Sequence, residues 1–155
     1  MTAAVLRALF EAALRAADPA PAVTRALSEA QMRLDHGAAH RVGVFAVGKA
    51  AAGMHAAAGL PDGPVLAVLP HGYPGPEWRG AEVLRASHPE PDRSSVAAAR
   101  RAFRFFESFS REDVVLCLVS GGTSSLLCLP RAGWTLASKR REIRRLVRRG
   151  ASIVA

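Results

Sequence analysis

The chain has 155 residues, 50% of them hydrophobic, which is the size and composition of one globular domain or of part of a larger one. It contains neither the run of about 20 apolar residues that a membrane-spanning helix needs nor the charged start of a signal peptide, so we expect a soluble, cytoplasmic protein. The net charge is +8, but seven basic residues crowd into residues 139–149, so much of the excess belongs to one segment.

The first part of the chain predicts two helices, a strand and a third helix. A capped amphipathic helix is expected over residues 2–17 and a second helix over residues 21–33. Residues 41–47 form an apolar run typical of a buried strand. A helix rich in small residues should follow and end near residue 58, because small side chains allow a helix to approach a sheet closely.

The middle of the chain predicts two more strands and a long helix. The strands are expected over residues 64–69 and 81–86, with a Pro- and Gly-rich loop between them. Two prolines stiffen the loop over residues 87–92, and a helix should follow to about residue 109. Its inward side chains are expected to be Val96, Ala99, Phe103 and Phe106.

The last part of the chain predicts a buried strand and a basic helix. Residues 113–119 are almost purely apolar, as in a buried parallel strand, and the basic helix is expected over residues 135–150. Strands alternate with helices along the whole chain. We therefore expect an α/β fold, a Rossmann-like three-layer domain with a mainly parallel sheet flanked by helices.

A loop rich in glycine and hydroxyl residues follows the strand over residues 113–119. Glycines let a backbone approach a ligand closely, and a helix that starts there would aim free N–H groups at an anion. The loop could therefore bind phosphate, or it could be an ordinary turn between a strand and a helix. Its residues are Ser120, Gly121, Gly122, Thr123, Ser124 and Ser125.

Polar residues also follow two other strands. Lys49 comes after the first strand, and His88 and Asp92 lie on the loop after the third. Ligands of open α/β sheets bind beyond the carboxyl ends of the strands, so the three loops together predict a site for an anionic ligand. Each residue also has a plain alternative: Lys49 as a solvent-exposed lysine, Asp92 as a helix N-cap and His88 as a loop histidine bonded to backbone.

Two cysteines and a basic segment complete the candidate features. Cys117 and Cys128 lack metal-ligand spacing, so we expect two buried, reduced thiols and no metal site. The basic segment fits either a nucleic-acid or membrane-surface patch or the solvated face of a helix. We favour the solvated face, because apolar residues recur there at helical spacing and no aromatic residues are interleaved for base stacking.

Four segments together resemble the glycerate 2-kinases of the MOFRL type, whose members are often labelled hydroxypyruvate reductase. They are Ala-Val-Gly-Lys-Ala-Ala over residues 46–51, Ser-His-Pro-Glu-Pro-Asp over residues 87–92, the segment over residues 119–130, and the end of the basic helix at residues 149–153. Their order and spacing agree with the family over nearly the whole chain.

The resemblance implies transfer of a phosphoryl group from ATP, with Mg²⁺, to the 2-hydroxyl of D-glycerate in a cleft between two α/β domains. It assigns Lys49 as the essential active-site lysine, with His88 and Asp92 on the facing loop. Ser120, Gly121, Gly122, Thr123 and Ser124 would form the phosphate- or substrate-binding loop. Two departures stand out: Thr123 where the family has glycine, and Pro70-His71-Gly72 where it has a lysine-containing pattern.

The resemblance also implies that residues 1–155 are the N-terminal α/β domain and that the C-terminal domain is absent. A half-cleft cannot close around ATP, so we expect this polypeptide alone to be inactive, as a fragment or as half of a split enzyme whose partner is a separately encoded C-terminal domain. Alternatives are a sugar-phosphate-binding module of the sugar isomerase type, a nucleic-acid-binding protein, and an NAD-dependent reductase, although no Gly-x-Gly-x-x-Gly follows the first strand.

Overall fold

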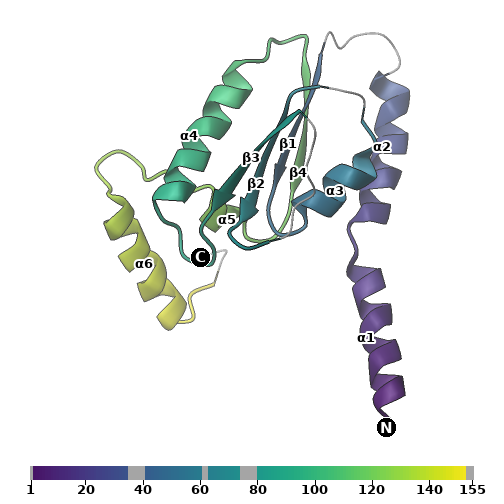
Figure 1. The fold of residues 1–155 in the computed structure, drawn as a ribbon. Helices are drawn as coiled ribbons and strands as arrows, with labels where there is room; N and C mark the ends of the chain where they lie inside the picture. The colour runs from purple at the N-terminus through teal and green to yellow at the C-terminus, as the bar shows by residue number, and fades with distance from the viewer. Residues whose placement is uncertain (1, 35–40, 61–62, 74–79, 153–155) are drawn as a thin grey trace.

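A computed structural model describes residues 2–34, 41–60, 63–73 and 80–152 of the chain. Its centre is a four-stranded parallel sheet in the order β3-β2-β1-β4 (Figure 1). The strands are β1 (Val42–Val47), β2 (Val65–Pro70), β3 (Ala81–Ala86) and β4 (Val114–Val119). All four expected strands are present, within two residues of their expected bounds.

Helices cover both faces of this sheet, which confirms the predicted α/β fold with helices flanking a parallel sheet. The pair α2 (Ala20–Leu34) and α3 (Ala51–Ala58) lies on one face, and α4 (Arg93–Glu107) lies on the other (Figure 1). The lysine-containing turn that precedes α3 and the short helix α5 (Thr123–Leu126) lie at the carboxyl ends of the strands.

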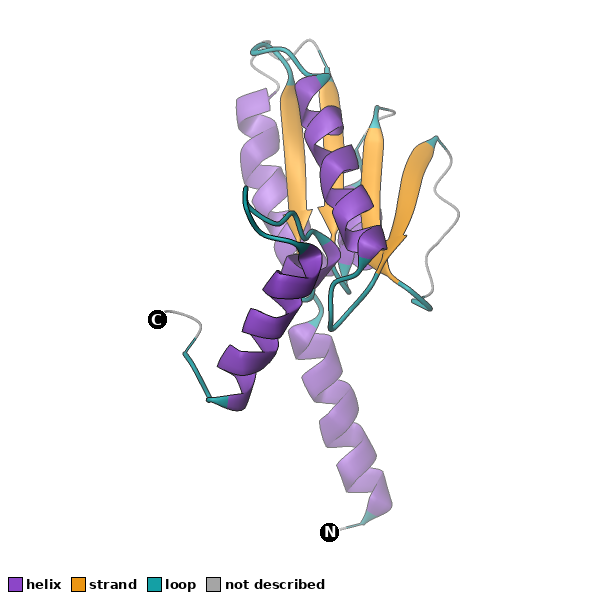
Figure 2. Ribbon diagram, turned by 90° about the vertical axis from the view of Figure 1, so that its left-hand side faces the viewer, coloured by secondary structure: helices purple, strands orange, loops and turns teal. Residues whose placement is uncertain are grey.

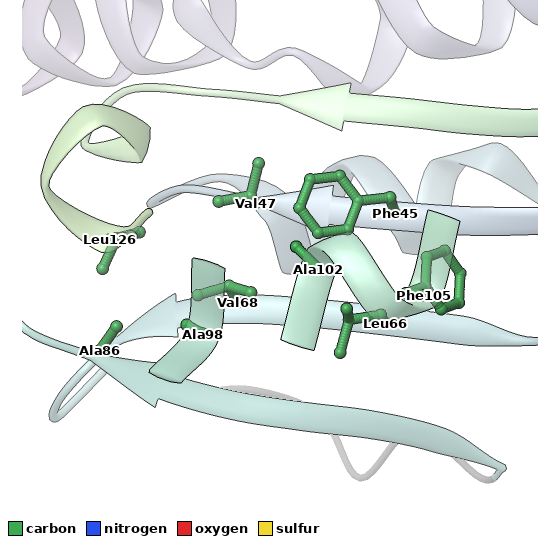
Figure 3. Packing of buried hydrophobic residues seen from close by; sticks show 9 residues of the cluster. All are labelled: Phe45, Val47, Leu66, Val68, Ala86, Ala98, Ala102, Phe105 and Leu126. Carbon is green, nitrogen blue, oxygen red and sulfur yellow. The ribbon is translucent and has the colours of Figure 1, made fainter. Parts of the chain in front are cut away.

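The two central strands send alternate side chains to the two faces, because successive residues of a strand point in opposite directions. Phe45 and Val47 of β1 pack with α4, whereas Val44 and Ala46 pack with α2 and α3. Figure 3 shows the core on the α4 side. Its buried members are Phe45, Val47, Leu66, Val68, Ala86, Ala98, Ala102, Phe105 and Leu126. Burial on both faces explains why β1 and β2 are continuous apolar runs instead of alternating ones.

The buried face of α4 differs from the expected one. Ala98, Ala99, Ala102 and Phe105 are buried, which confirms Ala99 as an inward residue. Phe103 is 58% exposed, so its assignment as an inward residue was wrong. Phe106 is 38% exposed, although its ring packs edge to face on that of Phe45. The stripe begins at Ser95, which is fully buried. Ser95 can be buried because its hydroxyl accepts a hydrogen bond from the backbone N–H of Asp92, which completes a capping box at the start of the helix.

The strand β4 is less buried than its apolar sequence predicts. It lies at the edge of the sheet, only Leu118 among its residues is buried, and Val119 is 56% exposed. The expectation that both thiols are buried is therefore wrong for Cys117, which is exposed on this strand, and right for Cys128. An apolar run indicates a strand but does not reveal whether the strand has neighbours on both sides.

Two helices lie apart from the sheet, α1 (Ala3–Ala17) and α6 (Leu136–Arg148) (Figures 1 and 2). Neither helix has a buried residue. The apolar stripe of α1 is exposed along its length, from 47% at Val5 to 64% at Phe10. In the described ranges, none of the helices has the length and hydropathy required to span a bilayer.

This difference in burial predicts a difference in stability between two leucine variants. Leu66→Ala removes a side chain with no exposed surface and should lower the free energy of unfolding by about 2–5 kcal/mol. Leu9→Ala removes one that is 58% exposed and should change it by no more than about 0.5 kcal/mol. Urea denaturation followed by circular dichroism measures both, and equal losses would show that α1 is packed in solution.

Candidate functional site

The polar loops singled out in the sequence meet at one point of the sheet. The chain adds β2 and β3 on one side of β1 and then crosses to add β4 on the other side. Strand order therefore reverses between β1 and β4, which is the position where open α/β sheets form a crevice for ligands. The turn after β1 contains Lys49, and the turn after β4 contains the glycine-rich loop.

The turn between β1 and α3 has its polar groups bonded to the protein itself. The backbone N–H of Lys49 donates to the carbonyl of Gly121 at 2.9 Å, and that of Ala50 donates to the hydroxyl of Ser120 at 3.0 Å. The next N–H, of Ala51, donates to the carbonyl of Gly48 at 3.4 Å. Three donors at the start of α3 are thus already satisfied within the protein, so this turn does not offer them to an anion.

Gly48 allows the two turns to approach this closely. Its φ is +115°, and a Cβ at this position would lie 2.6 Å from the carbonyl oxygen of Ser120. Other residues rarely adopt this backbone conformation, and the obstructing atom belongs to the backbone and cannot swing away. A side chain at Gly48 would therefore separate the loop after β1 from the loop after β4.

The hydroxyls of Ser120 and Thr123 hold the glycine-rich loop together. Ser120 Oγ donates to the carbonyl of Val47 at 3.2 Å, in addition to accepting from Ala50. Thr123 Oγ1 donates to the carbonyl of Ser120 at 2.7 Å. Thr123 is the first residue of α5, and the positive φ of the loop, +98°, falls on Gly122. The threonine that replaces the family glycine therefore introduces no unfavourable φ.

The backbone of the same loop leaves donors for a ligand. Among the described residues, the N–H groups of Gly121 and Gly122 make no hydrogen bond to another protein atom. Gly121 is also exposed, as is Ser124. Of the five loop residues assigned from the sequence, Ser120 and Thr123 bond to backbone through their hydroxyls, whereas Gly121 and Gly122 have N–H groups without a protein acceptor among the described residues and Ser124 is exposed.

Two further predicted residues lie against this loop. A Cβ placed on Gly122 would be 2.9 Å from Cδ2 and 3.3 Å from Nε2 of His88, and 3.7 Å from Cγ of Lys49. Gly122 thus lies beside both the imidazole of His88 and the side chain of Lys49, although His88 follows the edge strand β3 and Lys49 follows the central strand β1. Lys49 is exposed and His88 is half-buried.

Asp92 caps a helix. Its Oδ1 accepts hydrogen bonds from the backbone N–H groups of Ser94 at 2.8 Å and Ser95 at 3.3 Å, and also from the hydroxyl of Ser94. The bond from the Ser94 hydroxyl is the main cause that lowers the pKa of Asp92 below its usual range. Asp92 therefore orients α4 and the loop before it, which was the plain alternative weighed from its sequence position.

The carboxylates at this edge do not form a magnesium site by themselves. Among the described residues, no group of three or more His, Cys, Asp or Glu side chains could hold a metal ion. Magnesium in nucleotide-dependent enzymes is held by one or two carboxylates together with the phosphates of the substrate.

Two contacts at the site were not foreseen from the sequence. Ser125 Oγ donates to the carbonyl of Pro89 at 2.6 Å and ties the glycine-rich loop to the loop that carries His88. In the second contact, the carboxylate of Glu90 accepts hydrogen bonds from Arg140 and Arg144 of α6. Proline at positions 89 and 91 was the available signal, because it marked this loop as rigid, but it did not show what the loop touches.

The fold and the site define a class of protein, a doubly wound α/β domain with its polar loops at the point where strand order reverses. The model of a family described as "Domain of unknown function (DUF4147)" matches residues 5–155. The chain belongs to this family.

Named relatives give the family two functional labels. The chain is 39% identical over 153 residues to the "Putative hydroxypyruvate reductase" of Agrobacterium vitis, covering 96% of this chain and 33% of that protein. It is 33% identical over 150 residues to the glycerate 2-kinase of Pyrococcus horikoshii, covering 91% of this chain and 33% of the relative. The chain thus spans about a third of the length of these curated relatives.

A solved structure agrees with the kinase label. The crystal structure of glycerate kinase from Thermotoga maritima superposes with a TM-score of 0.70 at 33% sequence identity. The match covers 84% of this chain and 32% of that one. The likeness confirms the predicted resemblance to glycerate 2-kinases and the α/β fold.

The geometry at Gly122 predicts opposite outcomes for two neighbouring alanine variants. Gly122→Ala should lower the free energy of unfolding by about 1–3 kcal/mol, because alanine is strained at a φ of +98° and its Cβ would press on His88. Gly121→Ala is the matched control, since a Cβ there has no neighbour within 4 Å. Urea denaturation measures both, and equal effects would contradict the tight packing at Gly122.

The cap at Asp92 predicts a stability that depends on pH. Asp92→Ala should cost about 1 kcal/mol at pH 7, whereas Asp92→Asn should cost less, because asparagine also caps helices well. The native pKa of Asp92 is lowered, so the advantage of the wild type over Asp92→Asn should be complete above about pH 4 and should vanish as pH falls through the native pKa. Urea denaturation between pH 7 and pH 3 tests this, and a constant difference across that range would refute it.

Proposed function

We propose that residues 1–155 form one wall of the active site of a kinase that transfers a phosphoryl group from ATP to the 2-hydroxyl of D-glycerate. The observation that carries the proposal is the convergence of the Lys49 side chain, the His88 ring and the open N–H groups of Gly121 and Gly122. The glycerate kinases among the relatives support the reaction and both substrates.

The groups at this edge suit phosphoryl transfer, which depends on positioning and charge neutralisation more than on covalent chemistry. The exposed Lys49 is close enough to the loop to offset the charge of phosphate oxygens bound there. The N–H groups of Gly121 and Gly122 are donors of fixed direction, because hydrogen bonds of Ser120 and Thr123 hold the loop around them. Ser124 adds an exposed hydroxyl to the same loop.

The remaining parts of the site are assigned to other components. Mg²⁺ would arrive with the phosphates of ATP, because the described residues of this wall form no carboxylate set for it. The opposite wall would come from the part of the protein that corresponds to the other two thirds of the relatives' length, in the same or in a separately encoded polypeptide. His88 is proposed to line the substrate side of the lysine, and Asp92 to hold the His88 loop at the start of α4.

A nicotinamide-dependent reductase is less consistent with this geometry, although the Agrobacterium vitis relative has a reductase name. Dinucleotide-binding folds bind the pyrophosphate at the turn after the first strand, where helix N–H groups must be open. Here the N–H groups of Lys49, Ala50 and Ala51 donate to protein atoms. The turn after β1 also lacks the Gly-x-Gly-x-x-Gly pattern of those folds, which favours the kinase.

A lysine variant tests the proposal directly. Lys49→Ala should weaken binding of ATP to the purified chain about tenfold, because it removes a charged donor from the phosphate site. Lys49→Arg should retain part of the affinity, since it keeps the charge but not the shape of the ammonium group. Isothermal titration calorimetry at a fixed salt concentration gives the affinities.

The chain provides a matched control, because its only other lysine is Lys139 on α6. Lys139→Ala removes the same charge and should leave the affinity unchanged, so equal losses for the two variants would reveal non-specific attraction to a basic protein. Formation of 2-phosphoglycerate by the 155-residue polypeptide alone, detected in a coupled assay, would refute the assignment of a single wall to these residues.

A further inference from the structure

Two arginines of the basic helix α6 bind one carboxylate outside the helix, that of Glu90. Arg140 Nη2 donates to Oε2 of Glu90 at 2.9 Å, and Arg144 Nε donates to Oε1 at 2.6 Å, while Arg144 Nη2 also reaches Oε2. Both carboxylate oxygens are therefore engaged, and Arg144 binds in the two-pronged geometry that makes such pairs specific.

Glu90 lies in the loop that carries His88, two residues further along the chain. Prolines at positions 89 and 91 flank it and fix the backbone on both sides. Three attachments hold this loop: Asp92 caps α4, the carbonyl of Pro89 accepts from Ser125, and Glu90 is held by α6. The first two connect the loop to the body of the domain, and the third connects it to a helix that has no buried residue.

The pairing of Glu90 with Arg140 and Arg144 should hold at neutral pH and weaken as salt is added. Hydrogen bonds from Arg144 and Arg140 lower the pKa of Glu90 to about 2, so the carboxylate is ionised throughout the neutral range. The three side chains are partly exposed, at 37% for Arg140, 46% for Arg144 and 43% for Glu90. Added salt screens exposed charges over a distance of about 10 Å at 0.1 M. Salt should therefore weaken the pairing of Glu90 with the two arginines more than the other two attachments of the loop.

We propose that Glu90 is a positioning residue. The hydrogen bonds from Arg140 and Arg144 to its carboxylate fix the position of the loop over residues 87–92. The loop in turn places His88 against Gly122 and Lys49. The inference depends on the proposed function for its consequence, since the loop would line the kinase site. It gives the basic helix a role other than binding nucleic acid, because two of its arginines hold the loop of the candidate site.

The test uses Glu90→Gln, which removes the charge and keeps the shape of the side chain. The His88 ring signals and the Gly122 amide signal in NMR spectra of the labelled chain report the loop position without any ligand. We expect both to shift in Glu90→Gln, and we expect added sodium chloride to move the wild-type signals in the same direction. Affinity for ATP, measured by calorimetry, should fall by about two- to fivefold.

Glu142→Gln is the matched control, because Glu142 pairs with Arg145 within α6 and does not contact the loop. It should leave the His88 and Gly122 signals unchanged even if it alters the stability of the helix. Arg144→Gln should reproduce the shifts of Glu90→Gln, and the double variant should add little to either, as expected for two groups that act as one pair.

The outcomes separate this inference from the kinase proposal. If His88 and Gly122 signals in Glu90→Gln match the wild type, or if Glu142→Gln shifts them equally, Glu90 does not position the loop. If the signals shift as expected but the wild-type chain binds no ATP, the positioning role stands and the proposed function fails.

Discussion

The contact between the turn after β1 and the turn after β4 is the constraint on which the site depends. Ser120 bonds through its hydroxyl to the carbonyl of Val47 and to the N–H of Ala50, and Gly48 leaves the space that lets it do so. This contact occupies the N–H groups of Lys49 and Ala50, whereas those of Gly121 and Gly122 have no protein acceptor among the described residues. Parallel pairing of β1 with β4 brings the two turns together. The hydrogen bonds between the turns then determine which N–H groups remain without a protein acceptor.

Periodicity and composition were sufficient to predict the elements of the fold. Buried runs such as residues 42–47 and capping residues such as Thr135 depend on local sequence, and they appear where expected. The burial of β4 was not predictable, because its apolar residues look the same whether the strand is central or at an edge. Phe103 was misplaced because the phase of α4 is set by Ser95, a polar residue whose burial depends on its bond to the cap.

The sequence predicted which residues come together at the candidate site, but not which of them bond to the protein and which remain open. The strand ends indicated which loops come together, since parallel strands deliver their carboxyl ends to one edge. Whether Ser120 would face a ligand or a neighbouring turn depends on a contact with residues about seventy positions earlier. The pairing of Glu90 with Arg144 likewise requires the placement of α6, which no local pattern in the sequence encodes.

The exposed strand β4 has a consequence for handling the protein. Its sequence, Val-Val-Leu-Cys-Leu-Val, has no charge and no proline, the features by which natural edge strands discourage pairing with other chains. A solution of this polypeptide thus presents an uncapped β-template, with an exposed thiol at Cys117 in its middle. Strand addition would act on these six residues, so dilute conditions suit the isolated chain best.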